Sequence, residues 1–406
     1  VIVGCFYTLK RPYIGVLLWS WLSYMSPHRL SFGFAYSLPF AKVTAVVLLV
    51  SLLFSKESKK LPINTITIIW LMFLLIMILS TMNAFYPEDA SLQLKKILKI
   101  QLVTFLTMMV ITDIEKLRKL IWVIVVSIGY FSVKGGIFTI KTAGAYIVWG
   151  PPSSFIEDNN ELAIAILMTI PLMLFLRQVS DNKWVKIILL ISVFLSLFTV
   201  LGSQSRGAFL SILTVGMVFW LKSKAKIMSG SLIVLMVVLL AAFLPNTWYE
   251  RMNTIETYEE DKSAMGRINA WMYSINVAND HILGAGLESW KREAFVVYAP
   301  DSTDVHAAHS IYFNVLADHG WIGLLLFVLI FYLTWRTLNR ISKLTEGNND
   351  LLEHNRLAKM LQISLMAYFS GGMFLSLSYF DLPWHLVSFI IILERMMKDI
   401  EVENSS

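Results

Sequence analysis

Apolar runs recur along the whole chain and constrain its fold more than any other feature. About 20 mostly apolar residues suffice to cross a bilayer as an α-helix. Such spans are predicted at residues 13–25, 38–54, 63–82, 97–112, 119–134, 160–177, 184–202, 206–221, 227–244, 309–334, 358–378 and 383–397. The sequence therefore predicts an all-α polytopic membrane protein of about 12 transmembrane helices with one large outer loop.

The composition agrees with this prediction. Apolar residues make up 56% of the chain and charged residues 15%, whereas about a quarter of a soluble domain is charged. The net charge of +6 comes from short connectors rather than from a basic patch, so no nucleic-acid partner is expected. Cys5 is the only cysteine, which excludes an internal disulfide. The start at Val1, without Met, suggests that an N-terminal segment is missing, and no cleavable signal peptide is recognisable.

The distribution of basic residues predicts the orientation in the membrane. Lys and Arg gather in every second connector, as expected for the cytoplasmic side; examples are Lys59, Arg118, Lys183, Lys224 and Arg340. The alternate connectors, including the long one at 245–308, then face outward. The predicted parts are a transmembrane bundle at 1–244, the outer loop with short helices at 245–308, transmembrane helices at 309–397 and a cytoplasmic tail at 398–406. Loops as long as 245–308 are often functional.

His309 lies where the long loop meets a span. A neutral imidazole there could accept a proton from an alcohol, or it could simply hydrogen-bond to the loop. A helix starting at His309 would place it on one stripe with Tyr312 and Gly320, and Gly320 would allow a second helix to approach closely. Asp318 and His319 are ionisable groups in the same apolar run, which makes them functional candidates as well.

Arg206 lies in the segment Gly202-Ser-Gln-Ser-Arg206-Gly-Ala between two predicted spans. Such an arginine can extend to lipid headgroups or bind phosphate bidentately. The flanking glycines and serines favour phosphate binding, because they would leave room for an anion and add donors. Arg267 lies in the outer loop, on a helical pattern with Trp271; taken alone it could be a surface charge or a partner of Glu259, Glu260 or Asp261.

Two further patterns bear on cofactors and helix ends. His306 and His309 are spaced like a possible metal pair, but this spacing is weak evidence and no metal is predicted. A nucleotide-binding glycine loop is missing from the sequence, so no cofactor is expected and an activated lipid is the favoured energy source. Asp158-Asn159-Asn160-Glu161 precedes a span and predicts either a helix cap or a contact to a polar substrate.

These residues together resemble the O-antigen ligase family of bacterial inner-membrane proteins. The resemblance rests on His309-Ser310 followed by Gly320 and Gly323, on Ser205-Arg206-Gly-Ala, and on Gly266-Arg267 with Trp271 and a later Gly284-Ala-Gly286. It implies transfer of a glycan from undecaprenyl pyrophosphate to an acceptor hydroxyl on the periplasmic side, with inversion and without metal or nucleotide. By the same resemblance, His309 would activate the acceptor, and Arg206 and Arg267 would hold the donor pyrophosphate. The outer loop would be periplasmic.

The N-terminal stretch Arg11-Pro-Tyr-Ile-Gly through Pro27-His28-Arg29-Leu is similar to an exosortase-associated subgroup of O-glycosylation ligases. The acceptor implied is therefore either lipid A-core or a protein or other exported polymer. Two alternatives stay open. A repeat-unit polymerase would use the same donor with a lipid-linked acceptor. A polysaccharide transporter would typically show repeats and broken helices at the bilayer midplane, and the sequence shows no internal repeat.

Overall fold

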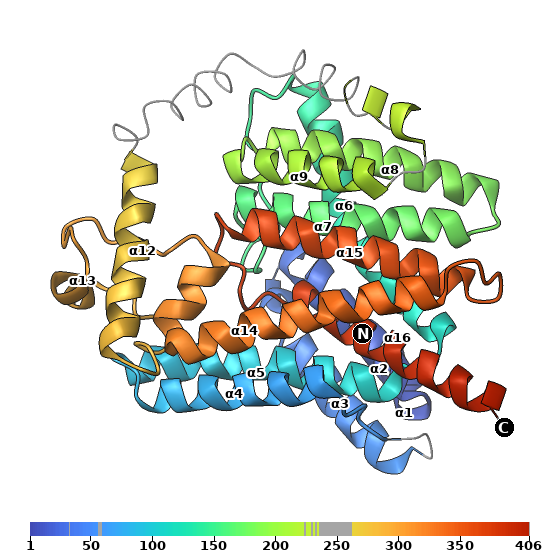
Figure 1. Cartoon of the computed structure of the whole chain (residues 1–406), viewed down its shortest axis with the longest axis horizontal. Helices are drawn as coiled ribbons and strands as arrows, with labels where there is room; N and C mark the ends of the chain where they lie inside the picture. Colours follow the sequence, from blue (N-terminus) through green and yellow to red (C-terminus); the bar gives the residue numbers. More distant parts are fainter. Residues whose placement is uncertain are drawn as a thin grey trace.

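The chain folds into a bundle of long helices with a second group of helices at one end (Figure 1). The computed structural model describes residues 1–31, 33–55, 59–222, 225–228, 230, 231, 234 and 262–405. Every regular element in these residues is a helix, so the all-α prediction is confirmed for the described part of the chain. The elements are α1 (Ile2–Lys10), α2 (Pro12–Met25), η1 (Pro27–Leu30), η2 (Gly33–Ser37), α3 (Phe40–Phe54), α4 (Thr65–Met82), α5 (Pro87–Val110), α6 (Ile114–Lys141), α7 (Asn159–Val179), α8 (Lys183–Gly202), α9 (Arg206–Lys222), α12 (Lys262–Asp280), α13 (Arg292–Tyr298), α14 (Ile311–Leu344), α15 (Leu352–Gly372) and α16 (Asp381–Ser405).

All predicted spans except 227–244 coincide with a helix, and that segment lies mostly outside the described residues. Several boundaries differ by six residues or more; for example, α5 begins earlier, at Pro87, α6 and α14 end later, at Lys141 and Leu344, and α15 both begins and ends earlier, at Leu352 and Gly372. In the described residues five helices are long and apolar enough to cross a membrane, namely α4, α6, α7, α8 and α14, and α3 and α9 are shorter apolar helices. The chain is therefore a multi-pass membrane protein, and the full count of about 12 spans stays a prediction.

The centre of the bundle is α7, which packs against α6, α8, α9 and α15. Its first turn is capped by Asp158, whose Oδ1 accepts a hydrogen bond of 2.8 Å from the backbone N–H of Asn160. The capping prediction is thus confirmed. The next side chain, Asn159, donates a hydrogen bond of 2.6 Å to the carbonyl of Ser203 in the α8–α9 turn. The start of α7 is therefore fixed to the start of α9.

A cluster of aromatic rings joins the other side of the bundle. Trp384 of α16 stacks on Trp70 and Phe73 of α4, with ring centroids 5.1 and 5.8 Å apart, and contacts Phe327 of α14. The indole N–H of Trp70 is buried and donates to Oε1 of Gln101 at 2.8 Å. The cluster therefore buries large apolar surface without leaving this polar group unpaired.

Helix α14 is broken at Gly320, whose φ of +66° is left-handed. A segment of the outer loop fills the break: the N–H groups of Ala285 and Gly286 donate to the carbonyls of Ala317 and Asp318, at 2.8 and 3.1 Å. In an unbroken helix those carbonyls would bond to N–H groups four residues further on. A Cβ on Gly320 would lie 2.3 Å from the carbonyl oxygen of Ile282. Gly320 is thus needed for the break and for close backbone contact, which differs from the predicted role in helix packing.

The part of the long loop that the structure describes, residues 262–308, has a small core of its own. Tyr273 and Val277 of α12 and Phe295 of α13 are fully buried there, and the rings of Tyr273 and Phe295 stack 4.4 Å apart. The loop is joined to the α4–α5 turn, because the N–H of Phe85 donates to the carbonyl of Ala285 at 2.9 Å. Figure 1 shows α12 standing across the ends of the long helices, with α13 beside it. We call residues 262–308 the cap.

Candidate functional site

His309 lies at the junction of the cap and α14, outside the helix. Its φ is +44°, a left-handed conformation that is uncommon for residues other than glycine. Helix α14 begins at Ile311, with Ser310 as its N-cap residue. The prediction that a helix starts at His309 and places it on a stripe with Tyr312 and Gly320 is therefore wrong. A junction residue that turns the chain into a helix cannot itself follow the helical period.

Two side chains of α12 hold the chain that leads to His309. The indole N–H of Trp271 donates to the carbonyl of Ala308 at 2.8 Å, and the same ring stacks on Phe313 of α14, with centroids 4.8 Å apart. The side chain of Asn269 donates to the carbonyls of Asp301 and Asp304 at 2.8 and 2.9 Å. Its oxygen accepts the N–H of Asp301 at 2.8 Å. The conformation at His309 is therefore set by α12.

Arg267 lies on α12, one turn before Trp271, and acts electrostatically on His309. The pKa of the His309 imidazole is lowered from its ordinary value, first by burial, which disfavours the charged form, and second by the positive charge of Arg267. The carboxylate of Asp158, the cap residue of α7, acts in the opposite direction. The ring still has solvent access, since His309 is exposed. A lowered pKa keeps the imidazole neutral near pH 7, which is the form that accepts a proton.

Arg206 is the first residue of α9 and lies at the same end of the bundle as His309. One hydrogen bond and one electrostatic interaction place it there. Asn159 joins the start of α7 to the turn before Arg206, and Asp158 beside it influences His309. The structure thus brings the charge of Arg267 close enough to act on His309, and it places Arg206 at the same end of the bundle.

The glycines and serines around Arg206 do not surround an open space. The space beside Gly202 is filled by Thr139, and the space beside Gly207 by Phe374. The serine hydroxyls serve the backbone: that of Ser203 donates to the carbonyl of Val200 at 2.6 Å, and that of Ser205 accepts the N–H of Ala208 at 3.2 Å. These small residues pack helices and cap α9, so they do not leave room for an anion as predicted. The proposed partners of Arg267 at 259–261 lie outside the described residues.

His306 is directed to a different partner from His309. Its Nε2 lies 2.7 Å from Oδ1 of Asp304, within the same loop. In the part of the chain that the structure describes, no three His, Cys, Asp or Glu side chains are grouped so that they could hold a metal ion. The metal-independent reaction stays a prediction.

A buried polar network below the cap was not predicted as a unit. The hydroxyl of Tyr379 donates to Oδ2 of Asp318 at 2.7 Å and lies 2.8 Å from Nε2 of His319, whose Nδ1 lies 2.6 Å from the hydroxyl of Ser80. Asn314 also donates to Asp318, at 3.1 Å. Asp318 and His319 are conspicuous in the sequence as ionisable residues in an apolar run. Asn314 precedes Asp318 by one turn of α14, but the other partners, Ser80 of α4 and Tyr379 before α16, are far away in the sequence, and nothing in it pairs them with Asp318 or His319.

The fold and this site define a multi-pass membrane protein with a folded cap over one end of its spans and a cationic, histidine-bearing site between cap and bundle. Residues 191–328 match the sequence model of a family described as O-antigen ligase, and this segment contains Arg206, Arg267 and His309. The resemblance to the O-antigen ligase family is thereby confirmed over this segment. Residues 1–181 match a second model, described as a family of unknown function (DUF5935). No curated protein matches the chain.

Proposed function

We propose that the chain transfers an O-antigen-like glycan from undecaprenyl pyrophosphate to an acceptor hydroxyl on the periplasmic side of the bacterial inner membrane. The acceptor is lipid A-core or another exported polymer or protein. The proposal rests on the O-antigen ligase match over 191–328 and chiefly on one observation: α12 places the cation of Arg267 near a His309 imidazole whose pKa is lowered. A neutral base beside a cation suits an alcohol acceptor and an anionic leaving group.

In the proposed reaction, a ring nitrogen of His309 accepts the proton of the acceptor hydroxyl. The oxygen forms a bond to the anomeric carbon of the donor sugar from the face opposite the pyrophosphate. The bond between that carbon and the pyrophosphate oxygen breaks, and its electron pair leaves with undecaprenyl pyrophosphate. Arg267 and Arg206 stabilise the charge that develops on the leaving oxygen. The products are an inverted glycoside, undecaprenyl pyrophosphate and one proton, which is later released from His309.

The proposal is tested with purified protein, a radiolabelled polyprenyl-pyrophosphate glycan and a hydroxyl acceptor. His309→Ala should reduce transfer by about 10²-fold or more, because general base catalysis typically contributes 10²–10⁴-fold. His306→Ala is the matched control, since His306 lies in the same loop and pairs with Asp304 instead. It should retain near wild-type transfer. Near-normal transfer by the His309 variant would remove the assigned base.

A second variant tests the donor site. Arg206→Lys keeps a positive charge but cannot bind a phosphate through two parallel hydrogen bonds. It should raise the KM for the lipid-linked donor and lower transfer, whereas full activity would favour an arginine that only extends to lipid headgroups.

The choice of acceptor separates ligase from polymerase. A ligase transfers the label to lipid A-core or to an exported polymer, whereas a repeat-unit polymerase transfers it to a second lipid-linked glycan. Label that crosses a vesicle membrane without any new glycosidic bond would indicate transport.

The orientation is tested by cysteine labelling in a Cys5→Ser background. Val297 in the cap is 68% exposed, and Asn348 lies in the exposed turn after α14. Single cysteines at these positions should react with an impermeant reagent from opposite sides of the membrane. Labelling of both from the same side would contradict the proposed topology.

A further inference from the structure

A basic cavity lies at the end of the bundle opposite His309. Its volume is about 960 Å³, and it is lined by α4, α14 and α16. Arg336, on its wall, follows the break at Gly320 by 16 residues, or roughly 24 Å along an α-helix, and His309 lies before that break. The cavity is thus at the far end of the spans, which the positive-inside rule assigns to the cytoplasmic leaflet.

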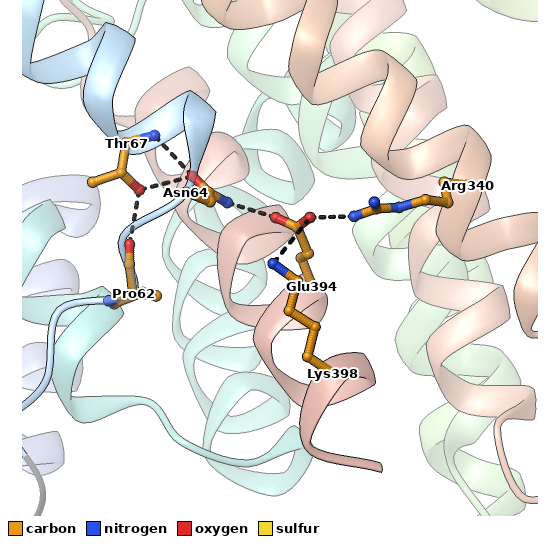
Figure 2. A network of polar contacts seen from close by, with 6 residues as sticks. All are labelled: Pro62, Asn64, Thr67, Arg340, Glu394 and Lys398. Carbon is orange, nitrogen blue, oxygen red and sulfur yellow. Dashed lines mark hydrogen bonds and ion pairs between the residues drawn. The ribbon is translucent and has the colours of Figure 1, made fainter. Parts of the chain in front are cut away.

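Positive charge is in excess in this cavity. Four cationic side chains line it, Arg336, Arg340, Lys343 and Lys398, against a single carboxylate, that of Glu394. Glu394 is already engaged: it forms ion pairs with Arg340 and, at 3.8 Å, with Lys398, and it accepts a hydrogen bond of 2.5 Å from the side chain of Asn64. Figure 2 shows these three groups converging on the one carboxylate.

The remaining cations keep no such partner. Within the described part of the chain, the side chains of Arg336 and Lys343 form neither a hydrogen bond nor an ion pair, although both line the cavity. The cavity also has apolar walls formed by Ile66, Leu333 and Leu344. Two uncompensated cations beside apolar surface match a phosphate group attached to a hydrocarbon-bearing molecule.

We propose that this cavity binds the phosphate headgroup of an anionic phospholipid from the leaflet at that end of the bundle. Arg336 and Lys343 bind the phosphate, and the apolar walls accommodate the glycerol and the upper acyl chain. A volume of about 960 Å³ is within the range of small-molecule sites, which is about 300–1,000 Å³. The inference is independent of the glycan transfer proposed above, because it concerns the other end of the molecule.

The test measures lipid retention by native mass spectrometry of the purified full chain in detergent. Phosphatidylglycerol should be retained and zwitterionic phosphatidylcholine should not. The double variant Arg336→Gln/Lys343→Gln should reduce retention of phosphatidylglycerol by about tenfold or more, since each cation near a phosphate contributes on the order of a fivefold factor in affinity. Lys183→Gln/Lys186→Gln removes the same charge from α8, away from the cavity, and should retain the lipid normally.

A third variant predicts a change of opposite sign. Glu394→Gln removes the internal carboxylate that competes for Arg340 and Lys398, so retention of phosphatidylglycerol should increase. Water-soluble glycerol 3-phosphate should not displace the lipid at equal concentration.

Retention of phosphatidylcholine, equal loss in the α8 control, or displacement by glycerol 3-phosphate would each overturn the proposal. A circular dichroism spectrum of each variant checks that the helices are intact, and the sign of the Glu394 effect tests the site even if the double variant folds poorly.

Discussion

The indole N–H of Trp271 donates a hydrogen bond of 2.8 Å to the carbonyl of Ala308, the residue directly before His309. The same ring stacks on Phe313 beyond His309, so one side chain of the cap contacts the chain on both sides of the candidate base. His309 itself is in a left-handed conformation, which costs about 1–2 kcal/mol in an L-residue. The cap therefore stabilises a local geometry that the junction would not adopt alone.

Trp271→Phe should lower transfer by several-fold while leaving the protein folded. Phenylalanine keeps a ring that can stack on Phe313 but leaves the buried carbonyl of Ala308 without its donor, which costs about 1–3 kcal/mol. The measurements are the transfer rate and the melting temperature in detergent. Trp290→Phe is the control, because Trp290 belongs to the same cap cluster and makes only ring contacts in the described structure. Equal rates for both variants would contradict a positioning role for Trp271.

The pH dependence of transfer should follow the charge of His309. The imidazole accepts a proton only when neutral, so the rate falls as the pH drops through its pKa, and burial and Arg267 have moved that pKa below the ordinary value. Arg267→Gln should therefore move the acid limb of kcat/KM to higher pH.

Asp158→Asn provides a control of opposite sign. Its carboxylate raises the pKa of His309, so removing the charge should move the acid limb to lower pH, and Asn still caps α7. The pH at the midpoint of the acid limb is compared, rather than the maximal kcat/KM, because Arg267 is also proposed to contact the donor and its loss would lower the maximum. Midpoints that move in the same direction, or not at all, would exclude His309 as the titrating base.

Gly320→Ala should destabilise the protein strongly. The new Cβ would lie 2.3 Å from the carbonyl oxygen of Ile282, and the residue would keep a left-handed φ of +66°. Gly347→Ala is the matched control: its φ is +79°, but nothing lies within 4 Å of the added Cβ. The control should lose only about 1–2 kcal/mol of stability, which is the cost of a left-handed φ in an L-residue. Gly320→Ala should lower the stability measured by thermal unfolding clearly more. Similar losses would show that the backbone contact relaxes easily.

Tyr379→Phe should lower stability without selectively removing activity. The hydroxyl connects buried Asp318 and His319, and its loss leaves buried polar atoms unpaired at a cost of about 1–3 kcal/mol. Transfer per folded molecule should stay within a few-fold of wild type. Tyr332→Phe, at an exposed position of α14, should change neither quantity. A large loss of transfer at unchanged melting temperature would instead assign the network to the reaction.

The positions of the helices could be predicted well from the sequence, because an apolar run long enough to span a membrane is visible in a continuous stretch of residues. The sequence also predicted Asp158 as the N-cap residue of α7, where the side chain accepts a hydrogen bond from the backbone two residues further on. The break at Gly320 could not be predicted from the sequence. A glycine that lets a second helix approach closely and a glycine that interrupts a helix occur in similar sequences. What distinguishes them is the backbone of Ile282 and Gly284, which the fold brings to the same place.

The candidate site was predictable only in part, for the same reason. His309, Arg206 and Arg267 could be assigned to one side of the membrane from the charge of the connectors. The distances between these three side chains depend on how α12 packs against the chain before α14. That packing uses Asn269 and Trp271, which donate hydrogen bonds to backbone carbonyls more than 30 residues away. Residue types give no indication of which carbonyl a side chain will meet.

The filled break in α14 has a consequence for exchanging parts between relatives. Because Ala285 and Gly286 supply the hydrogen bonds that the helix lacks at Ala317 and Asp318, the cap cannot be replaced at its apparent boundary before Ile311 without leaving those carbonyls unpaired. A chimera that imports the cap of a relative would therefore need to carry residues 262–320 as one segment. The natural joint between interchangeable parts lies inside the span, after Gly320.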